Sequence, residues 1–217
     1  MFDEIWQKVA VREKSRPYLI AVDGFSCAGK TTFSARLKEQ LESKSVNVIA
    51  MTLDGFHQPR AIRHQDLSPS GYVDLSFNYE RLRDELVPLR TPNRTDYLLQ
   101  VEYFDLETDA PVEPIHTALD TSAVVIVEGV TSLCTQLRDL YDFKIYLSLS
   151  EATCMERGLV RDVSKFGTVA QTRAKYAERF IPGQKLYEAT QRPDKASDLV
   201  IHEYGSASEE YRHAGDP

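Results

Sequence analysis

The sequence predicts an α/β fold in which helices cover both faces of a doubly wound, five-stranded parallel sheet. Five short, continuous apolar runs indicate strands that are buried on both faces of a sheet. Stretches with helical spacing of their apolar residues lie between them. Strands that alternate with helices form parallel sheets, because right-handed crossovers place the helices on both faces. The 217 residues suit one such unit, so we expect residues 1–217 to form a single domain.

The predicted elements follow one another in a regular order. Continuous apolar runs place the strands at 18–24, 46–54, 123–129, 143–150 and 196–203. Apolar residues at helical spacing place helices at 2–14, 31–44 and 78–90. The first helix is expected to end before Pro17. In the second helix, Phe33, Leu37 and Leu41 are spaced four residues apart and therefore share one face.

The interval between the second and third strands is unusually long. It holds a polar loop, one predicted helix and β-like pieces around 98–119. We expect residues from about 56 to 120 to form a substrate-side insertion, with a small hairpin over the mouth of the sheet. The last stretch, residues 205–217, is polar and is expected to fray.

Charge and cysteine content exclude several classes of partner. Lys and Arg number 26 against 33 Asp and Glu, so the net charge of -7 offers no general attraction for nucleic acid or an anionic membrane. The three cysteines are widely separated and form no C-x-x-C pair, which favours a reducing compartment. No apolar run approaches the roughly 20 residues that span a bilayer. We expect a cytoplasmic protein that acts on a small molecule, and leave open whether it forms a homo-oligomer.

One motif predicts a phosphate-binding loop. Residues 24–31 fit the pattern G-x-x-x-x-G-K-S/T and lie directly between a buried strand and a helix. Its glycines let backbone N–H groups point at phosphate oxygens, and the following helix adds its positive end. Lys30 would reach the β- and γ-phosphates, and the Thr31 hydroxyl would ligate Mg²⁺. The residues predicted to bind the nucleotide here are Gly24, Ser26, Cys27, Ala28, Gly29, Lys30, Thr31 and Thr32.

Two carboxylates end neighbouring predicted strands. Asp54 ends the second strand and Glu128 ends the third, and each is followed by glycine. Ligands of open α/β sheets bind beyond the carboxyl ends of the strands, so both side chains should face the loop. Phosphoryl transfer requires a metal held by hard oxygen ligands and a base near the attacking hydroxyl. Glu128 suits the metal and Asp54 suits the base, although both pairs could also be simple turn dipeptides.

A pair of arginines follows the fourth strand. Arg157 and Arg161 lie four residues apart on a predicted helix, where like charges repel each other slightly. A bound anion would relieve this repulsion, so we predict that residues from about 157 to 175 form a lid whose arginines clamp ATP phosphates. The alternative is a solvated helix in which Glu156 and Asp162 pair with the two arginines.

These motifs together resemble the uridine kinase and phosphoribulokinase family of P-loop kinases. The similarity covers most of residues 18–203 and includes GFSCAGKTT, TLDGFH, VVIVEG and ERGLVRD. The later segments RFIPGQKLY and ASDLVI also resemble the family. The resemblance implies a P-loop kinase fold and an ATP-dependent transfer of the γ-phosphoryl group to a hydroxyl of a metabolite, with Mg²⁺.

The resemblance also implies roles for individual residues. Asp54 would be the catalytic base, assisted by Lys30, and Thr31 and Glu128 would surround the magnesium ion. Its position alone, three residues past Asp54, makes His57 a further candidate for contact with the substrate. Segments of the insertion resemble those that line the nucleoside pocket and face the ribose, and their candidate substrate contacts are Tyr72, Asp74, Tyr103 and Asp105.

The acceptor of the phosphoryl group stays open at this point. A nucleoside such as uridine or cytidine is the first expectation, and nicotinamide riboside, pantothenate, a sugar or glycerate are alternatives. An alternative from another class is a P-loop nucleotide switch or regulatory ATP-binding module. Against it, the sequence has no guanine-reading N-K-x-D motif, and the insertion has the size of a substrate-binding element.

Overall fold

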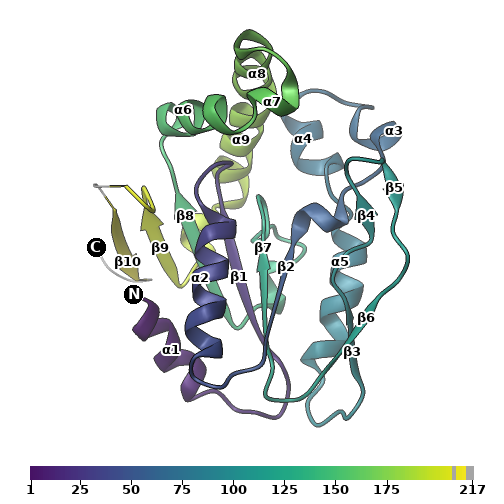
Figure 1. Ribbon diagram of the computed structural model, residues 1–217, viewed down its shortest axis with the longest axis vertical. Coiled ribbons are helices and arrows are strands. Elements are labelled where there is room, and N and C mark those ends of the chain that lie inside the picture. The colour runs from purple at the N-terminus through teal and green to yellow at the C-terminus, as the bar shows by residue number, and fades with distance from the viewer. Residues whose placement is uncertain (207–208, 214–217) are drawn as a thin grey trace.

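The computed structural model, which describes residues 1–206 and 209–213, has a doubly wound and largely parallel sheet (Figure 1). The strand order is β10-β9-β8-β1-β7-β2; five strands run parallel, and β10 pairs antiparallel with β9. The six strands are β1 (Tyr18–Gly24), β2 (Val48–Thr52), β7 (Val124–Glu128), β8 (Phe143–Ser148), β9 (Leu199–His202) and β10 (Glu210–His213). The first five are the predicted strands, which confirms the predicted fold class.

The sixth strand corrects the expectation that residues 205–217 fray. Glu210–His213 forms β10 at the edge of the sheet, although its residues are polar and partly exposed. An edge strand can form without an apolar run, because it is held by backbone hydrogen bonds to its neighbour. Residues 207, 208 and 214–217 of the same stretch lie outside the described residues.

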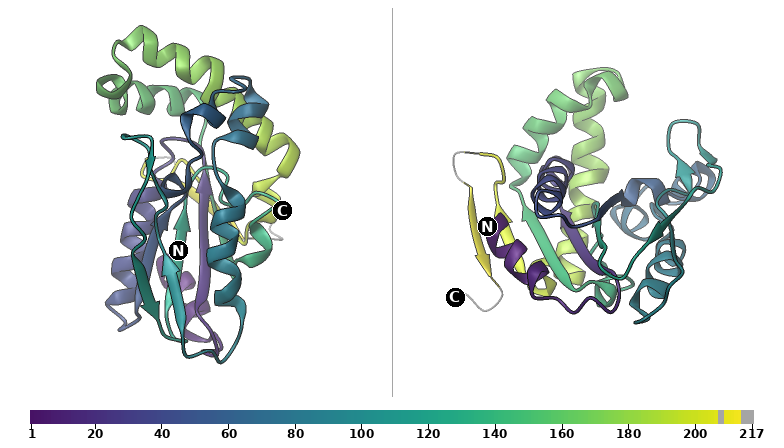
Figure 2. Two further views of the ribbon diagram at one scale, coloured as in Figure 1. Left: turned by 90° about the vertical axis from the view of Figure 1, so that its right-hand side faces the viewer. Right: turned by 60° about the horizontal axis from the view of Figure 1, so that its bottom comes forward.

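The sheet is buried on both faces. In β1, Leu19 and Ala21 belong to one hydrophobic core, and Ile20 and Val22 belong to the other. The helices that cover the faces are α1 (Phe2–Ala10), α2 (Lys30–Glu42), α5 (Tyr79–Leu86) and α9 (Ile181–Gln191). Helices α1 and α2 contribute to the core that contains Ile20, whereas α5 and α9 contribute to the opposite core, so the sheet lies between two helical layers (Figure 2).

The segment between β2 and β7 contains most of the short elements. They are η1 (Leu53–Phe56), α3 (Arg60–Arg63), α4 (Pro69–Leu75), α5, η2 (Val87–Arg90), β3 (Tyr97–Gln100), β4 (Phe104–Asp105), β5 (Ala110–Pro111) and β6 (His116–Leu119). The β3–β6 pair runs along the side of the molecule beside α5 and not over the mouth of the sheet (Figure 1). Its apolar residues Tyr97, Leu99 and Leu119 are buried in the main core, which holds the hairpin at the side.

Helices after β8 lie above the carboxyl ends of the strands (Figure 1). They are α6 (Glu151–Arg161), α7 (Val163–Phe166), α8 (Val169–Lys175), the π-helical turn η4 (Tyr176–Phe180) and α9. The Ser150 hydroxyl caps α6 by accepting a hydrogen bond from the Thr153 N–H group. The remaining short helices are η3 (Arg138–Leu140) and α10 (Pro193–Ala196).

Candidate active site

A cavity of about 810 Å³ lies at the carboxyl ends of the strands, between the loop after β1, the α3–α4 segment and the helices above the sheet. Of the residues singled out from the sequence, those that line it are Ser26, Lys30, Thr31, Asp54, His57, Tyr72, Glu128 and Arg161. Gly24, Cys27, Ala28, Gly29 and Thr32 form the loop and the first turn of α2 without lining the cavity. The structure therefore brings most of the predicted site together at one edge of the sheet.

The loop after β1 has the backbone of a phosphate cradle. Gly24, Cys27 and Gly29 take positive φ angles of 151°, 62° and 89°, so the chain curls tightly before α2 begins at Lys30. The Lys30 ammonium group is buried and donates hydrogen bonds to the carbonyl oxygens of Gly24 and Phe25, at 3.0 and 2.8 Å. The loop thus holds a lysine and the N-terminal N–H groups of a helix against the same cavity.

Side chains from later helices fix the loop from outside. Gln184 of α9 accepts a hydrogen bond from the Ser26 N–H group at 2.5 Å and donates one to the Ser26 hydroxyl at 3.1 Å. Arg157 of α6 donates to the carbonyl oxygens of Cys27 and Tyr204, at 3.2 and 3.3 Å. Arg157 does not line the cavity. Its position therefore supports the loop and does not place its guanidinium among the predicted phosphate contacts.

The two predicted carboxylates face the lysine. The Thr52 hydroxyl caps η1 by accepting a hydrogen bond from the Asp54 N–H group, and this turn directs Asp54 to the cavity. The Thr31 hydroxyl donates to Glu128 at 3.0 Å. Burial lowers the pKa of Lys30, and the nearby carboxylates of Glu128, Asp23 and Asp54 oppose that shift. Burial likewise raises the pKa of Glu128, opposed by the charge of Lys30.

The segments that contain Asp54–Gly55 and Glu128–Gly129 lie against each other, so these two pairs are not independent turns. A Cβ atom on Gly129 would lie 2.4 Å from the Cβ atom of Leu53, the residue before Asp54. Such an approach is far inside van der Waals contact, so only glycine fits there. The close contact holds the segment that carries Asp54 beside the segment that carries Glu128.

A fully buried carboxylate lies behind the loop. Asp23, the penultimate residue of β1, accepts hydrogen bonds from the N–H groups of Thr131 and Leu133 at 3.0 and 2.8 Å, and from the Tyr187 hydroxyl at 2.5 Å. Burial raises the pKa of Asp23 to about 6, and these hydrogen bonds oppose the shift. Asp23 ties β1 to the loop after β7, and its sequence signal is an acid inside an apolar strand.

His57 and Tyr72 lie near Asp54. A ring nitrogen of His57 lies 2.9 Å from the Asp54 carbonyl oxygen, and its ring centroid lies 4.4 Å from that of Phe77. Burial lowers the pKa of His57, so its imidazole is neutral at neutral pH. Tyr72 is buried against Phe180, and burial raises the pKa of its hydroxyl well above the ordinary value.

Three of the predicted substrate residues lie elsewhere, because none of Asp74, Tyr103 and Asp105 lines the cavity. Tyr103 donates a hydrogen bond to Glu85 and carries the Arg81 guanidinium 3.8 Å above its ring. Asp105 accepts hydrogen bonds within the β4–β5 turn, and Asp74 is exposed on α4. Local partners explain these placements, which do not support the predicted contacts with substrate.

The predicted repulsion between the two α6 arginines is already relieved within the protein. Arg161 forms two hydrogen bonds of 2.9 Å with Asp162 and one of 3.3 Å with the Tyr176 hydroxyl, and it lines the cavity. Arg157 is held by backbone carbonyl groups as described above. Only Arg161 therefore occupies a position from which it can meet a ligand in the cavity.

Several cavity residues carry no signal that we recognised in the sequence. On the side of the insertion and the later helices, the cations not singled out are Arg60, Arg63, Lys165, Lys175 and Arg179, of which Lys165 and Lys175 lie within the predicted lid. They come from α3, α7, α8 and η4, which are distant in sequence. A count of basic residues in the two segments PRAIR and AKYAERF could have suggested all of them except Lys165, but only the fold places both segments at one cavity.

The fold and the site together define a class of enzyme. A glycine-rich loop that ends in a lysine, with carboxylates at the ends of β7 and just past β2, is the arrangement of a P-loop kinase. Enzymes of this class are phosphotransferases.

Comparisons with known proteins identify the family. Residues 19–203 match the Phosphoribulokinase / Uridine kinase family, so the chain belongs to that family. A uridine kinase from Limosilactobacillus reuteri is 25% identical over 204 residues, which cover 91% of this chain and 88% of the relative. Membership of a kinase family is evidence against the nucleotide-switch alternative.

Solved structures share the fold. A possible uridine kinase from Bacillus stearothermophilus superposes with a TM-score of 0.68 at 21% identity, covering 92% of this chain and 96% of the other. A D-glycerate 3-kinase from Cryptococcus neoformans superposes with a TM-score of 0.64 at 13% identity, covering 96% and 97%. In addition, no helix within residues 1–206 and 209–213 is long and apolar enough to cross a membrane.

Proposed function

We propose that this protein transfers the γ-phosphoryl group of ATP to a hydroxyl group of a small metabolite, with Mg²⁺ as the metal. One observation carries the proposal: Lys30, Asp54 and the Thr31–Glu128 pair line the same cavity at the end of a phosphate-binding loop. These groups match the parts that phosphoryl transfer requires, namely a cation for the phosphates, a base for the hydroxyl and oxygen ligands for a metal.

The residues fit Mg²⁺. The Thr31 hydroxyl and the Glu128 carboxylate lie 3.0 Å apart and supply two hard oxygen atoms. Among the described residues, no cluster of three or more His, Cys, Asp and Glu side chains could hold a metal ion by itself. Mg²⁺ commonly binds one or two protein oxygens together with water and phosphate oxygens, so two ligands suffice. When bound, the ion would neutralise charge on the β- and γ-phosphates.

Asp54 serves as the base in this proposal. Its carboxylate is exposed to the cavity, beside Lys30 and the His57 ring. It accepts the proton as the acceptor hydroxyl attacks the γ-phosphorus and ADP leaves on the opposite side. Lys30, and Arg161 from the predicted lid, stabilise the charge that develops on the migrating group.

The first acceptors to consider are uridine and cytidine, because the family relative compared above is a uridine kinase. A second set contains nicotinamide riboside, pantothenate, sugars and glycerate. The members of that set that are not nucleosides are favoured by the positions of Asp74, Tyr103 and Asp105, which resemble nucleoside-pocket residues in sequence and lie outside the cavity.

The cysteines support a cytoplasmic location for this activity. All three are free, and Cys134 and Cys154 are buried, which suits a reducing compartment.

A coupled assay of ADP release tests the proposed function. The purified protein is given ATP and Mg²⁺ with each candidate acceptor in turn, and Lys30→Ala provides the blank. We expect at least one acceptor to raise ADP release well above that of the variant. ATP hydrolysis that no acceptor stimulates, or equal activity in Lys30→Ala, would contradict the proposal.

A further inference from the structure

The cavity has a strongly cationic wall on the side away from the phosphate-binding loop. Within the described residues this wall contains Arg60, Arg63, Lys165, Lys175 and Arg179, and the acids that line the cavity beside them are Glu178 and Asp162. The whole chain has a net charge of -7, so the excess of positive charge is local. A concave surface lined by charge of one sign attracts ligands of the opposite sign.

The α3 arginines are held in different ways. Arg63 forms an ion pair of 2.7 Å with Asp109 and donates from its Nε to the Gln58 carbonyl oxygen at 2.7 Å. Arg60 donates to Asp109 only through its backbone N–H group. Within residues 1–206 and 209–213, no carboxylate lies within 4.0 Å of the Arg60 guanidinium. Arg60 therefore lines the cavity without an ion pair of its own, and the nearby Asp109 carboxylate, which is paired with Arg63, offsets its charge only in part.

Arg179 is the most informative cation, because it is half-buried. Its guanidinium donates to the carbonyl oxygens of Arg63 and Asp66, at 3.0 and 3.4 Å. In the part of the chain that the structure describes, it has no carboxylate partner within 4.0 Å. The Asp66 carboxylate attracts Arg179 without forming an ion pair with it. Removing a cation from water without a direct counter-ion is unfavourable, so an arginine in this position favours an anionic ligand.

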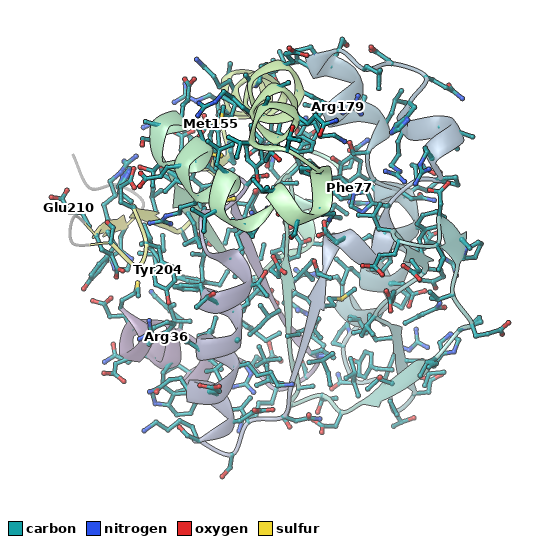
Figure 3. The ribbon with its side chains drawn as sticks, turned by 45° about the horizontal axis from the view of Figure 1, so that its top comes forward. Arg36, Phe77, Met155, Arg179, Tyr204 and Glu210 are labelled. Atoms are coloured by element: carbon teal, nitrogen blue, oxygen red, sulfur yellow. The ribbon has the colours of Figure 1, made fainter. Side chains whose placement is uncertain are left out.

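The positions of these arginines separate them from the predicted nucleotide contacts. Arg179 is hydrogen-bonded to Arg63 of α3 and to Asp66 between α3 and α4, not to the loop after β1. Figure 3 shows Arg179 on the side of the upper helices that faces the insertion, above Phe77. Asp54, His57 and Arg60 follow one another at intervals of three residues, so the chain leads from the base directly to this wall.

We propose that the acceptor carries an anionic group, a carboxylate or a phosphate ester, which Arg60, Arg63 and Arg179 bind while its hydroxyl faces Asp54. The inference rests on the proposed phosphotransfer and selects among its acceptors. The hydroxyl oxygen forms a bond to the γ-phosphorus, the bond from that phosphorus to the β,γ-bridging oxygen breaks, and the hydroxyl proton passes to Asp54. The anionic group takes no part in the reaction and serves only to orient the acceptor.

Pairs of acceptors that differ in charge test the inference. We would compare pantothenate with pantothenyl alcohol, D-glycerate with glycerol, and ribose 5-phosphate with ribose in the ADP-release assay. At least one anionic member should exceed its neutral partner by about tenfold or more in kcat/KM, the effect expected of charge-assisted hydrogen bonds. The pairs also distinguish a carboxylate from a phosphate ester.

Two variants test whether this cationic wall causes the preference for an anionic acceptor. For the favoured acceptor, Arg60→Gln and Arg179→Gln should each raise KM by about 10- to 100-fold, with little change in the KM for ATP. Arg173→Gln is the matched control, because Arg173 is exposed on α8 and does not line the cavity. If Arg179→Gln does not fold, Arg60→Gln alone still tests the inference, because the Arg60 side chain is exposed and its loss should not affect folding.

The failures of the two proposals are distinguishable. Efficient phosphorylation of uridine or another neutral acceptor, with Arg60→Gln as active as the parent, would overturn the anionic acceptor and leave the kinase intact. A rise in the KM for ATP in place of the acceptor KM would assign these arginines to the nucleotide and also overturn the inference. If no acceptor stimulated ADP release, the phosphotransfer itself would fail, and this inference with it.

Discussion

Asp54 is the side chain on which the proposed chemistry depends most directly. It lies on a single 3₁₀ turn capped by Thr52, which fixes its direction without burying it. Asp54→Asn keeps the shape and removes the ability to accept a proton. We expect kcat to fall by roughly 10² to 10⁴, the usual contribution of a general base, while ATP still binds. Steady-state kinetics and a nucleotide-binding titration measure the two effects separately.

Asp105→Asn is a suitable control for that variant, because Asp105 lies on a turn outside the cavity. It should retain the parent activity. If Asp54→Asn turned over as fast as the parent, Asp54 would not be the base.

His57 provides a prediction about pH. Its pKa is lowered mainly by burial, so between that pKa and the ordinary value of about 6.5 the unfolded chain binds more protons than the folded one. Stability therefore rises with pH through this window and is lost as the pH falls. We expect His57→Asn to lose less unfolding free energy than the parent when the pH drops from 7.5 to 5.5. Urea unfolding at both pH values measures the change in unfolding free energy. An equal loss in the parent and in His57→Asn would contradict the prediction.

Individual residues differ in how far the sequence predicts them. Lys30, Thr31, Asp54 and Glu128 could be placed because each ends or closely follows a buried strand, so local structure determines its direction. Gln184 could not, because its contact with Ser26 joins residues 158 positions apart. Asp74, Tyr103 and Asp105 are placed by local hydrogen bonds and exposure, which a resemblance of segments does not reveal.

The crossing of α6 with the later helices depends on Gly158. A Cβ atom there would lie 2.3 to 2.8 Å from three atoms of the Tyr176 ring, which is fully buried. The Tyr176 hydroxyl donates to Asp162 and lies 3.2 Å from the Cys27 sulfur in the loop. Gly158→Ala should therefore overpack the crossing and lower the unfolding free energy by about 1–3 kcal/mol.

Val160→Ala is the matched control on the same helix, since Val160 is 85% exposed. It should change stability by less than about 0.5 kcal/mol, as expected of a surface substitution. Denaturant unfolding compares the two variants. An equally small effect of Gly158→Ala would show that the crossing is looser than described.

Among the elements, those with a strong apolar pattern were predictable. The five parallel strands and helix α2 follow from continuous runs and regular spacing. The π-helical turn η4 was not predictable, because it interrupts a continuous helical stretch in which no residue type marks the change. Such turns are frequent at functional sites, and this one carries Tyr176, Arg179 and Phe180, all of which line the cavity.

The buried carboxylate of Asp23 connects distant parts of the molecule. It joins the end of β1, the loop after β7 and the hydroxyl of Tyr187 on α9. Tyr187→Phe removes the one side-chain donor among these and leaves the carboxylate under-satisfied. We expect the unfolding free energy to fall by about 1.5–3 kcal/mol, the range for hydrogen bonds to charged groups. Tyr211→Phe, at a tyrosine on β10 that is 45% exposed, should have little effect, and equal effects would contradict this role for Asp23.

Topology explains why the parallel sheet and its helical layers were predictable and the acceptor was not. Alternating strands and helices determine a parallel sheet whose strand ends share one edge, so the nucleotide-side residues converge there. The acceptor side is built from the insertion and from helices after β8, and their packing depends on tertiary contacts such as that of Arg179 with Arg63. No local pattern encodes those contacts.

A structure determined with Mg²⁺ and a non-hydrolysable ATP analogue is the most direct test of the convergence of Lys30, Asp54 and Glu128. We expect the triphosphate in the loop after β1, Lys30 in contact with the γ-phosphate, and the metal bound by Thr31 and Glu128, with Asp54 facing the γ-phosphorus. A triphosphate bound elsewhere, or a metal that Thr31 and Glu128 do not contact, would contradict the proposed phosphotransfer.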